Sequence, residues 1–324
     1  MANLKNFAGF DVSKKFFDVC SISGSGQQSK QFCYDEKGLD AVVKWLPKNC
    51  HCTMEATGPY YLKLAMKLHQ YGFTVSVVNP LVIKRFSQMR LLRAKTDKAD
   101  SKMIAEYGST QNPPLWEPPA AYILKLQQFE ALSHQLQKQR TALLCQKEAF
   151  TAAGMEKEVT QVLKTCIAHL EKQLDLISIK TEQLIEQHYQ QLLKRLISIP
   201  GLGKKTAIML ILLSDGFKKF ENYKQLSAYV GLCPRIFESG SSVRTKARIC
   251  KMGMSKIRAI LYVCSWSAKT CNTACKELYE RLIAKGKAKR LAMIAVANKL
   301  LKQAFAIGTN DEIYNANYSK NICF

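Results

Sequence analysis

One stretch of the chain constrains its fold more than any other. Between Ala120 and Ile199 there is no proline and a single glycine, Gly154, while leucine, isoleucine and valine recur at helical spacing. Such a run without helix breakers predicts two long helices that meet near Gly154, as an antiparallel hairpin or a coiled coil that pairs two chains. We therefore expect residues 121–196 to be a separate helical segment that serves assembly.

Prolines mark the boundary in front of this helical segment. Pro113, Pro114, Pro118 and Pro119 interrupt regular structure, so residues 111–120 are predicted to form a linker. Strand and helix signals alternate in residues 1–110, which predicts an α/β domain. After the helical segment, residues 197–308 are predicted to form a mostly α-helical domain, and residues 309–324 a tail.

Four acids of the N-terminal domain stand out by position. Asp11 and Glu55 each end a short apolar run that is typical of a buried strand. Asp97 and Asp100 are spaced so that both carboxylates lie on one face of a helix, which Thr96 is expected to cap. Packed against the sheet, this helix would bring all four acids together.

Four carboxylates in one cleft repel each other unless cations neutralise them. Mg²⁺ is the expected ion, with Mn²⁺ as a substitute, because both take oxygen ligands. A pair of such ions can activate the attacking oxygen and stabilise the leaving oxygen of a phosphodiester. Four other acids, Asp18, Asp35, Glu36 and Asp40, are expected to be ordinary surface or capping residues.

The charge of the chain indicates a polyanionic partner. There are 48 lysines and arginines against 25 aspartates and glutamates, a formal net charge of +23. Residues 200–324 hold 22 of these basic side chains and 7 of the acidic ones, so the main phosphate-binding surface is expected there. No signal peptide or membrane-spanning run is evident, so we expect a cytoplasmic protein with reduced cysteines and no zinc.

Two features of the C-terminal segment suggest how it meets nucleic acid. Gly201-Leu202-Gly203 runs into a helix, as in helix-hairpin-helix modules, which present backbone N–H groups to a phosphate. Ser239 lies in a polar loop among cations, where a hydroxyl could attack phosphorus and form a covalent phosphoserine link. The cations expected to bind nucleic acid are Lys204, Lys205, Arg235, Arg244, Lys246, Arg248, Lys251, Lys256 and Arg258.

These motifs together resemble those of the insertion-sequence 110 family of transposases, which are related to the Piv-type DNA invertases. The similarity covers nearly the whole chain. It is carried by Gly9-Phe10-Asp11-Val12-Ser13-Lys14, Met54-Glu55-Ala56-Thr57-Gly58-Pro59-Tyr60, Lys95-Thr96-Asp97-x-x-Asp100, Ile199-Pro200-Gly201-Leu202-Gly203, Gly231-Leu232-x-Pro234-Arg235, Ser239-Gly240 and Lys251-x-Gly253.

The resemblance implies a fold and a set of site residues. It implies a RuvC-like, ribonuclease-H-like N-terminal domain that carries Asp11, Glu55, Asp97 and Asp100, and a transposase domain with an essential serine. Ser239 is our choice for that serine because it directly precedes the glycine. Ser241 and Ser242 stand where such proteins commonly have glycine, and they remain alternatives. The resemblance also implies a structured guide RNA made by the element.

The expected function is DNA transposition or site-specific recombination. The protein would cut and rejoin element ends and target DNA as a homo-oligomer, a dimer or a tetramer. One alternative is a Mg²⁺-dependent RuvC-like junction endonuclease, which acts by water attack without a covalent intermediate. A second alternative is a protein that binds nucleic acid without catalysis, which predicts salt-sensitive binding that survives loss of Asp11 and Ser239.

Overall fold

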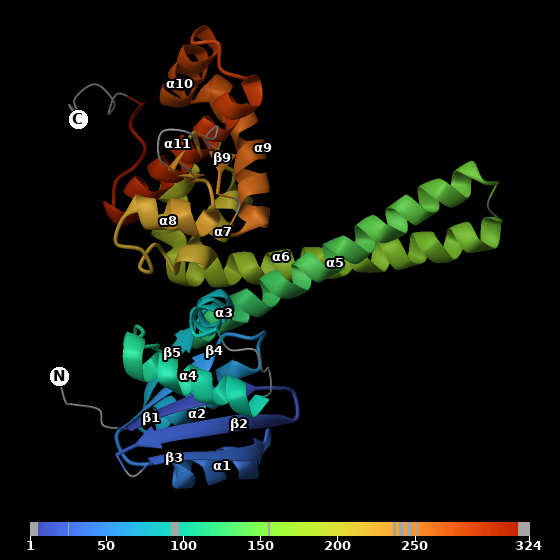
Figure 1. Cartoon of the computed structure of the whole chain (residues 1–324). Coiled ribbons are helices and arrows are strands. Elements are labelled where there is room, and N and C mark those ends of the chain that lie inside the picture. The colour runs from blue at the N-terminus through green and yellow to red at the C-terminus, as the bar shows by residue number, and fades with distance from the viewer. Residues whose placement is uncertain are drawn as a thin grey trace. The chain divides into compact units, whose positions relative to one another are not determined.

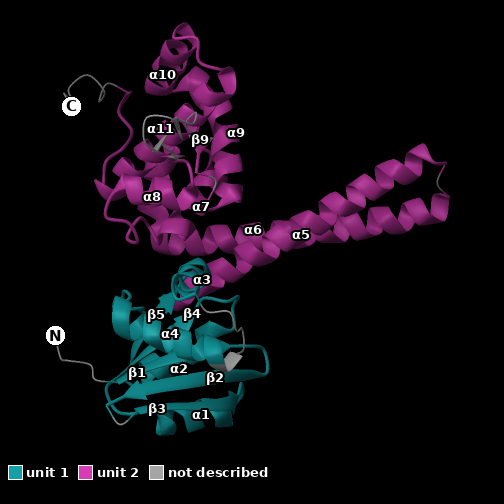
Figure 2. Cartoon of the chain, viewed as in Figure 1, with its two compact units in different colours: residues 1–119 teal, residues 120–324 magenta. Residues whose placement is uncertain are grey.

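The computed structural model of the chain describes residues 6–24, 26–91, 97–154, 156–235, 238–239, 243–244, 248–250 and 252–316. It divides into two compact units, residues 1–119 and 120–324 (Figure 2). The helical segment and the C-terminal domain expected from the sequence therefore belong to one unit. The backbone alone is described for Asp97, Lys98, Arg235, Glu238, Ser239, Val243, Arg244 and Arg248.

The first unit is built on a mixed sheet of five strands in the order β3-β2-β1-β4-β5. The strands are β1 (Asn6–Val12), β2 (Phe16–Ser23), β3 (Gly26–Cys33), β4 (Cys50–Glu55) and β5 (Thr74–Val78). β1, β2 and β3 form an antiparallel meander, whereas β4 runs parallel to both β1 and β5. The predicted α/β character of this part, with strands that end near Asp11 and Glu55, is confirmed.

One face of this sheet is apolar. Side chains alternate between the two faces of a strand, and Phe10, Phe17, Val19 and Met54, which lie on this face, are fully buried. They pack in one cluster with side chains of α1 (Glu36–Trp45) and α2 (Tyr61–Gln70). Burial of this apolar surface is the main stabilising contribution to the first unit.

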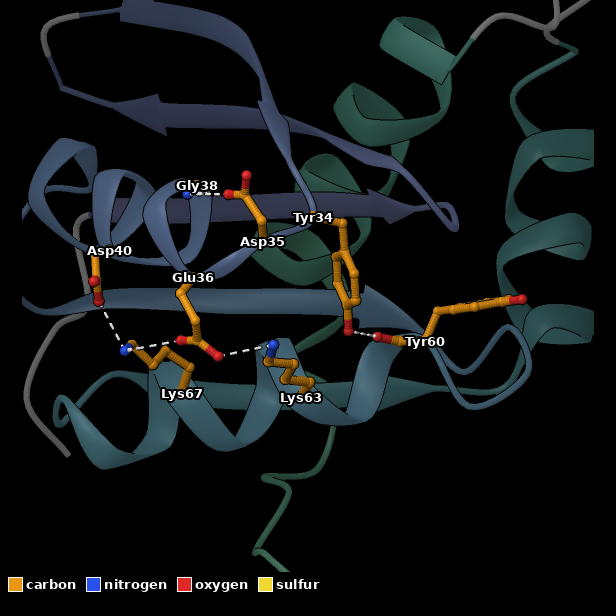
Figure 3. A network of polar contacts seen from close by, with 8 residues as sticks. All are labelled: Tyr34, Asp35, Glu36, Gly38, Asp40, Tyr60, Lys63 and Lys67. Carbon is orange, nitrogen blue, oxygen red and sulfur yellow. Dashed lines mark hydrogen bonds and ion pairs between the residues drawn. The ribbon is translucent and has the colours of Figure 1, made fainter.

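Polar contacts fix α1 against α2 (Figure 3). The Asp35 carboxylate caps α1 by accepting from the Gly38 N–H at 2.7 Å. Lys63 Nζ lies 2.8 Å from the Glu36 carboxylate, and Lys67 Nζ lies 2.7 Å from that of Asp40. These partners account for three of the four acids that were expected to be ordinary.

The other face of the sheet carries α3 (Pro80–Met89) and α4 (Asp97–Gln111). Asn79 caps α3, since its side-chain oxygen accepts from the Leu81 N–H at 2.9 Å. Phe86 of α3 and Ile104 of α4 pack together in a small buried cluster. α4 crosses this face over β1, β2 and β4, so it covers the strands that carry the candidate acids.

The proline-containing segment after α4 is held to the sheet. The Ser76 hydroxyl donates to the Pro114 carbonyl at 2.9 Å, and the Trp116 N–H donates to the Val75 carbonyl at 2.7 Å. The Trp116 ring packs against the apolar cluster under the sheet. The first part of the predicted linker is therefore fastened along β5.

A long helical hairpin opens the second unit (Figure 1). It consists of α5 (Ala121–Ala152) and α6 (Lys157–Ile197), which pack along each other and are joined near Gly154. Arg140 of α5 pairs with Glu171 of α6 at 2.6 Å. The two predicted helices and the break near Gly154 are confirmed.

The rest of the second unit is mainly helical. Its helices are α7 (Lys204–Ser214), α8 (Tyr223–Val230), α9 (Ser255–Cys271), α10 (Thr273–Ala284) and α11 (Lys289–Thr309). Two short strand pairs accompany them, β6 (Pro234–Arg235) with β9 (Arg248–Ile249), and β7 (Glu238–Ser239) with β8 (Val243–Arg244). The core lies between α7, α9, α11 and the C-terminal part of α6.

The sequence was expected to hold no segment that could span a membrane, but α11 has the length and composition for it. Among the described helices it alone has the length and apolar composition of a membrane span. Val296, Leu300 and Leu301 are, however, fully buried in the core of the second unit. The apolar composition of α11 is accounted for by its place in this core.

Candidate functional site

The strand register brings Asp11 and Glu55 to the same edge of the sheet. β1 and β4 are parallel, and Phe10 lies opposite Met54. Asp11 and Glu55 are the next residues on these strands. Since parallel neighbours direct their carboxyl ends to one edge, the two acids occupy adjacent positions there.

Close packing identifies the face on which these acids lie. A Cβ atom at Gly9 would lie 2.2 Å from the Ser101 carbonyl oxygen of α4, and one at Gly108 of α4 would lie 2.4 Å from the Thr53 hydroxyl. Gly9 and Thr53 each stand two residues before an acid, and side chains alternate along a strand. Asp11 and Glu55 therefore lie on the face that α4 covers.

The start of α4 supplies the other two acids. Ser101 lies over Gly9 in the middle of β1, and Asp97 and Asp100 precede it in the first turn of α4. The helix that carries Asp97 and Asp100 therefore packs on the same face of the sheet as Asp11 and Glu55. Thr96, the predicted cap of this helix, lies outside the described residues.

Neighbouring groups orient the acids on the strands. The Thr57 hydroxyl donates to Glu55 Oε1 at 2.8 Å. Asp18 of β2 lies directly opposite Asp11 and accepts from Gln31 Nε2 at 3.0 Å. Asp18 was expected to be an ordinary acid, and only the pairing of β1 with β2 reveals that it adjoins Asp11.

The described side chains do not by themselves form a metal site. Among them, no group of three or more histidine, cysteine, aspartate or glutamate side chains is arranged to hold a metal ion. The side chain of Asp97, the fourth predicted ligand, is outside the described set. The donors are all carboxylates, which suits a hard cation such as Mg²⁺, and the metal remains a prediction.

Ser239 lies in a short hairpin of the second unit. β7 and β8 are antiparallel, with Ser239 opposite Val243. Ser239 is the last residue of β7, and β8 begins at Val243. Ser241, Ser242 and the side chain of Ser239 lie outside the described atoms, and the choice among the three serines remains a prediction.

Two glycines fix the base of the segment that carries Ser239. A Cβ at Gly231 would lie 2.6 Å from the Met252 carbonyl oxygen, and one at Gly253 would lie 2.3 Å from that of Tyr229. Both glycines have positive φ, +80° and +136°. The motifs Gly231-Leu232-x-Pro234-Arg235 and Lys251-x-Gly253 therefore hold the two ends of the segment together.

The cations predicted to bind nucleic acid fall into different groups. Lys204 forms ion pairs with Glu182 and Glu186, and Lys256 pairs with Glu130, so internal acids partly neutralise both lysines. Arg258 Nη1 donates to the Val230 carbonyl at 2.9 Å. Lys204, Lys205 and Lys256 line one groove, which is formed mainly by α5, α6 and α7. Lys246, Lys251 and the side chains of Arg235, Arg244 and Arg248 lie outside the described atoms.

The predicted helix-hairpin-helix-like element corresponds to the turn between α6 and α7. Leu202 N–H donates to the Ile199 carbonyl at 3.0 Å, and Gly201 has φ of +92°. A Cβ at Gly201 would lie 2.6 Å from Cβ of Ala268 on α9. This glycine is thus required for the packing of the turn on α9, in addition to any contact with a phosphate.

Comparison with known proteins gives consistent results along the chain. The DEDD transposase model of the IS110 group matches residues 8–152, and the model described as "Transposase IS116/IS110/IS902 family" matches residues 193–280. The first match contains all four acids and the second contains Ser239.

Curated relatives match over almost the full length. The pilin gene-inverting protein of Moraxella lacunata is 32% identical over 315 residues, which cover 94% of this chain and 95% of the relative. The protein of the same name from Moraxella bovis is 31% identical over 318 residues, with the same coverage. The transposase for insertion sequence element IS1111A of Coxiella burnetii is 23% identical over 340 residues, which cover 94% of this chain and 90% of the relative. The chain therefore belongs to the IS110 family of transposases, which includes DNA-inverting relatives.

Proposed function

We propose that this protein is a DNA transposase or site-specific recombinase that cuts and rejoins DNA with Ser239 as the nucleophile. The observation that carries the proposal is that Asp11 and Glu55 end neighbouring parallel strands, on the face of the sheet that is covered by α4, the helix that bears Asp97 and Asp100. Family membership supports DNA recombination as the overall reaction.

A ribonuclease-H-like, RuvC-like fold for the first unit is part of the proposal. An antiparallel meander continued by two parallel strands, in the order β3-β2-β1-β4-β5, supports it. The central strand β1 and its parallel neighbour β4 carry the first two acids, and a helix packed on their polar face carries the others.

The four acids are proposed to hold Mg²⁺, or Mn²⁺ in its place. The ion would supply Lewis-acid polarisation of the phosphodiester that is cut. Thr57 would keep Glu55 in a fixed orientation through its hydrogen bond to Oε1. The acids themselves would orient the DNA strand only when their mutual repulsion is neutralised.

The serine step forms one bond and breaks one. The Ser239 oxygen would bond to phosphorus, the bond from phosphorus to the deoxyribose oxygen of the leaving strand would break, and the serine proton would pass to solvent while the leaving oxygen gains a proton. Attack by another DNA end would reverse the exchange and free the serine. The phosphodiester energy is kept in the intermediate, so rejoining needs no added energy source.

The partners proposed are element-end and target DNA, a structured guide RNA and further copies of the chain. The excess of basic side chains supports a polyanionic partner of either kind. Several DNA ends must be held at once, which favours a dimer or tetramer, and the long α5–α6 hairpin is suited to pairing subunits. The site of action is proposed to be the cytoplasm.

A covalent-trap experiment tests the proposal. The protein is mixed with labelled element-end DNA, Mg²⁺ and RNA transcribed from the element flank, and a detergent-resistant protein–DNA adduct is sought. Wild type should form the adduct, whereas Ser239→Ala and Asp11→Ala should not. Ser241→Ala and Ser242→Ala are matched controls, because both serines are within three residues of Ser239 in the sequence.

The same experiment separates the alternatives. DNA cleavage without an adduct, unaffected by Ser239→Ala, would make the protein a metal-dependent junction endonuclease. An adduct that is lost in Ser241→Ala or Ser242→Ala and kept in Ser239→Ala would move the nucleophile. Binding without cleavage under all conditions would indicate a non-catalytic nucleic-acid-binding protein.

A further inference from the structure

A cavity of about 600 Å³ lies in the second unit, between α9 and α11 and beside β9. Its wall is mainly apolar, with Leu232, Ile294 and Ala297 among the lining residues, and Tyr262 of α9 contributes an aromatic ring. The volume is within the range of about 300–1,000 Å³ that is usual for pockets that take a small molecule. The cavity is distinct from the edge of the sheet that carries the acids, since it belongs to the other unit.

Two arginines line this apolar cavity. Arg258 belongs to α9 and Arg290 to the first turn of α11. The hydrogen bond from Arg258 to the Val230 carbonyl fixes its guanidinium, and four further N–H donors remain on that group. A Cβ at Gly231 would lie 2.7 Å from Arg258 Nη1, so this glycine provides the space that the guanidinium occupies.

The cavity adjoins both ends of the segment that carries Ser239. Leu232 stands just before β6, and Ile249 lies in β9, which pairs with β6. The Cys250 N–H donates to the Cys233 carbonyl at 3.0 Å and closes the segment at this point. A ligand in the cavity would therefore lie beside the β6–β9 pair, between whose strands Ser239 lies in the sequence.

We propose that this cavity binds the base of an unpaired DNA nucleotide close to the phosphodiester that Ser239 attacks. A nucleobase is flat and has apolar faces, which suits a pocket with an aromatic wall, and its phosphate suits the two arginines. The inference rests on the proposed function for the choice of DNA and for the nearby phosphodiester that Ser239 attacks.

The surface of α9 next to the cavity supports a nucleic acid as the occupant. Val263 is 67% exposed and Trp266 is 55% exposed, and Lys269 Nζ lies 4.5 Å from the centre of the Trp266 ring. An exposed aromatic side chain beside a cation is typical of surfaces on which single-stranded bases stack. Lys285, Lys287 and Lys289 precede Arg290 and add positive charge.

A binding experiment without cleavage tests this inference. The probe is a dye-labelled DNA duplex with one unpaired nucleotide, compared at one salt concentration with the same duplex that has an abasic site at that nucleotide. The ratio of the two dissociation constants reports the base alone, because the phosphates are identical. Wild type should prefer the probe with the base by about five- to 150-fold, the range for one stacked base.

Two substitutions on α9 make a matched pair. Ala259→Trp introduces a large side chain at an exposed residue that lines the cavity, whereas Ser267→Trp adds the same side chain at an exposed residue of α9 that does not. The ratio should fall to about one in Ala259→Trp and stay at the wild-type value in Ser267→Trp. Tyr262→Leu should lower the ratio as well, and thermal unfolding followed by circular dichroism verifies that each variant is folded.

A substitution at a cation separates charge from base recognition. Arg290→Gln should weaken binding of both probes equally, because it removes a phosphate contact and leaves the apolar wall that binds the base unchanged. A wild-type ratio of one, or equal ratios in the two tryptophan variants, would overturn the inference. A larger ratio with an RNA duplex of the same design would replace DNA by RNA as the ligand.

The outcome is independent of the covalent chemistry. If the adduct forms and depends on Ser239 but the ratio does not respond to Ala259→Trp, the cavity has no such role and the proposed function stands. If no adduct forms in any protein but Ala259→Trp lowers the ratio, the cavity binds a base and the serine mechanism fails.

Discussion

The close approach of α4 to β1 makes Gly9 a test of the candidate acid site. A Cβ at this position would lie 2.1 Å from the Ala105 nitrogen and 2.2 Å from the Ser101 carbonyl oxygen, both of them backbone atoms of α4. Carbon atoms in contact are normally about 3.5–4.0 Å apart, so in Gly9→Ala the helix must move away from the sheet by more than about 1 Å. Overpacking of this kind costs about 1–3 kcal/mol.

The displacement should affect function more than stability. α4 carries Asp97 and Asp100 in its first turn, so its movement separates them from Asp11 and Glu55. A misplacement of about 1 Å at a reacting group can lower a rate by roughly 10²-fold. We expect Gly9→Ala to lose about that factor in the rate of covalent adduct formation while the protein still folds.

Two other glycines complete the series. Gly24→Ala, in the turn between β2 and β3, is the matched control, since a Cβ there meets nothing within 4 Å. Gly108→Ala should lose an intermediate amount of stability and activity. Its Cβ would lie 2.4 Å from the Thr53 hydroxyl, which belongs to a side chain that can rotate. Urea unfolding gives the stability and the covalent trap gives the activity. If Gly9→Ala and Gly24→Ala had the same free energy of unfolding and the same rate of adduct formation, the close packing on which the site is built would be refuted.

Three further predictions concern single side chains. Thr57→Val removes the hydrogen bond to Glu55 and should raise the Mg²⁺ concentration for half-maximal adduct formation by about 10- to 100-fold, with unfolding in urea unchanged; an unchanged Mg²⁺ requirement would contradict the orienting role. Burial lowers the pKa of His51, so the unfolded chain takes up this proton at a higher pH than the folded chain, and the free energy of unfolding should fall as the pH drops below about 6.5. Urea unfolding at pH 7 and pH 5 measures the loss, which should be smaller in His51→Gln. Burial raises the pKa of Cys275 to about 12, so iodoacetamide at pH 8 should alkylate the exposed Cys33 and Cys145 long before it; early modification of Cys275 in the mass spectrum would show that this thiol is accessible.

Local sequence signals were sufficient for much of the fold. The absence of proline between Ala120 and Ile199 predicts α5 and α6, because nothing in that stretch interrupts backbone hydrogen bonding. The apolar runs before Asp11 and Glu55 predict β1 and β4. These features depend on residues close in sequence, which is why a pattern could reveal them.

Features that depend on pairing between distant segments could not be read from the sequence. Asp18 adjoins Asp11 only through the register of β1 with β2. Trp116 belongs to a predicted linker, yet its N–H bonds to Val75 on β5. The apolar run of α11 was not expected as a possible span, and only its burial in the second unit identifies it as a core helix.

The ion pairs of the second unit bear on where nucleic acid binds. Lys204 and Lys256 were predicted as phosphate contacts, but each has acidic partners on α5 or α6, and an exchange of these partners for phosphate would leave the carboxylates unpaired. Arg258 instead donates to a backbone carbonyl, so phosphate binding there would leave no carboxylate unpaired. Arg290 lies in the first turn of α11 and lines the cavity between α9 and α11, and Lys285, Lys287 and Lys289 precede it in the sequence. The surface around Arg258 and Arg290 therefore keeps more uncompensated positive charge than the start of α7. We expect DNA to contact this surface, beside the segment that carries Ser239.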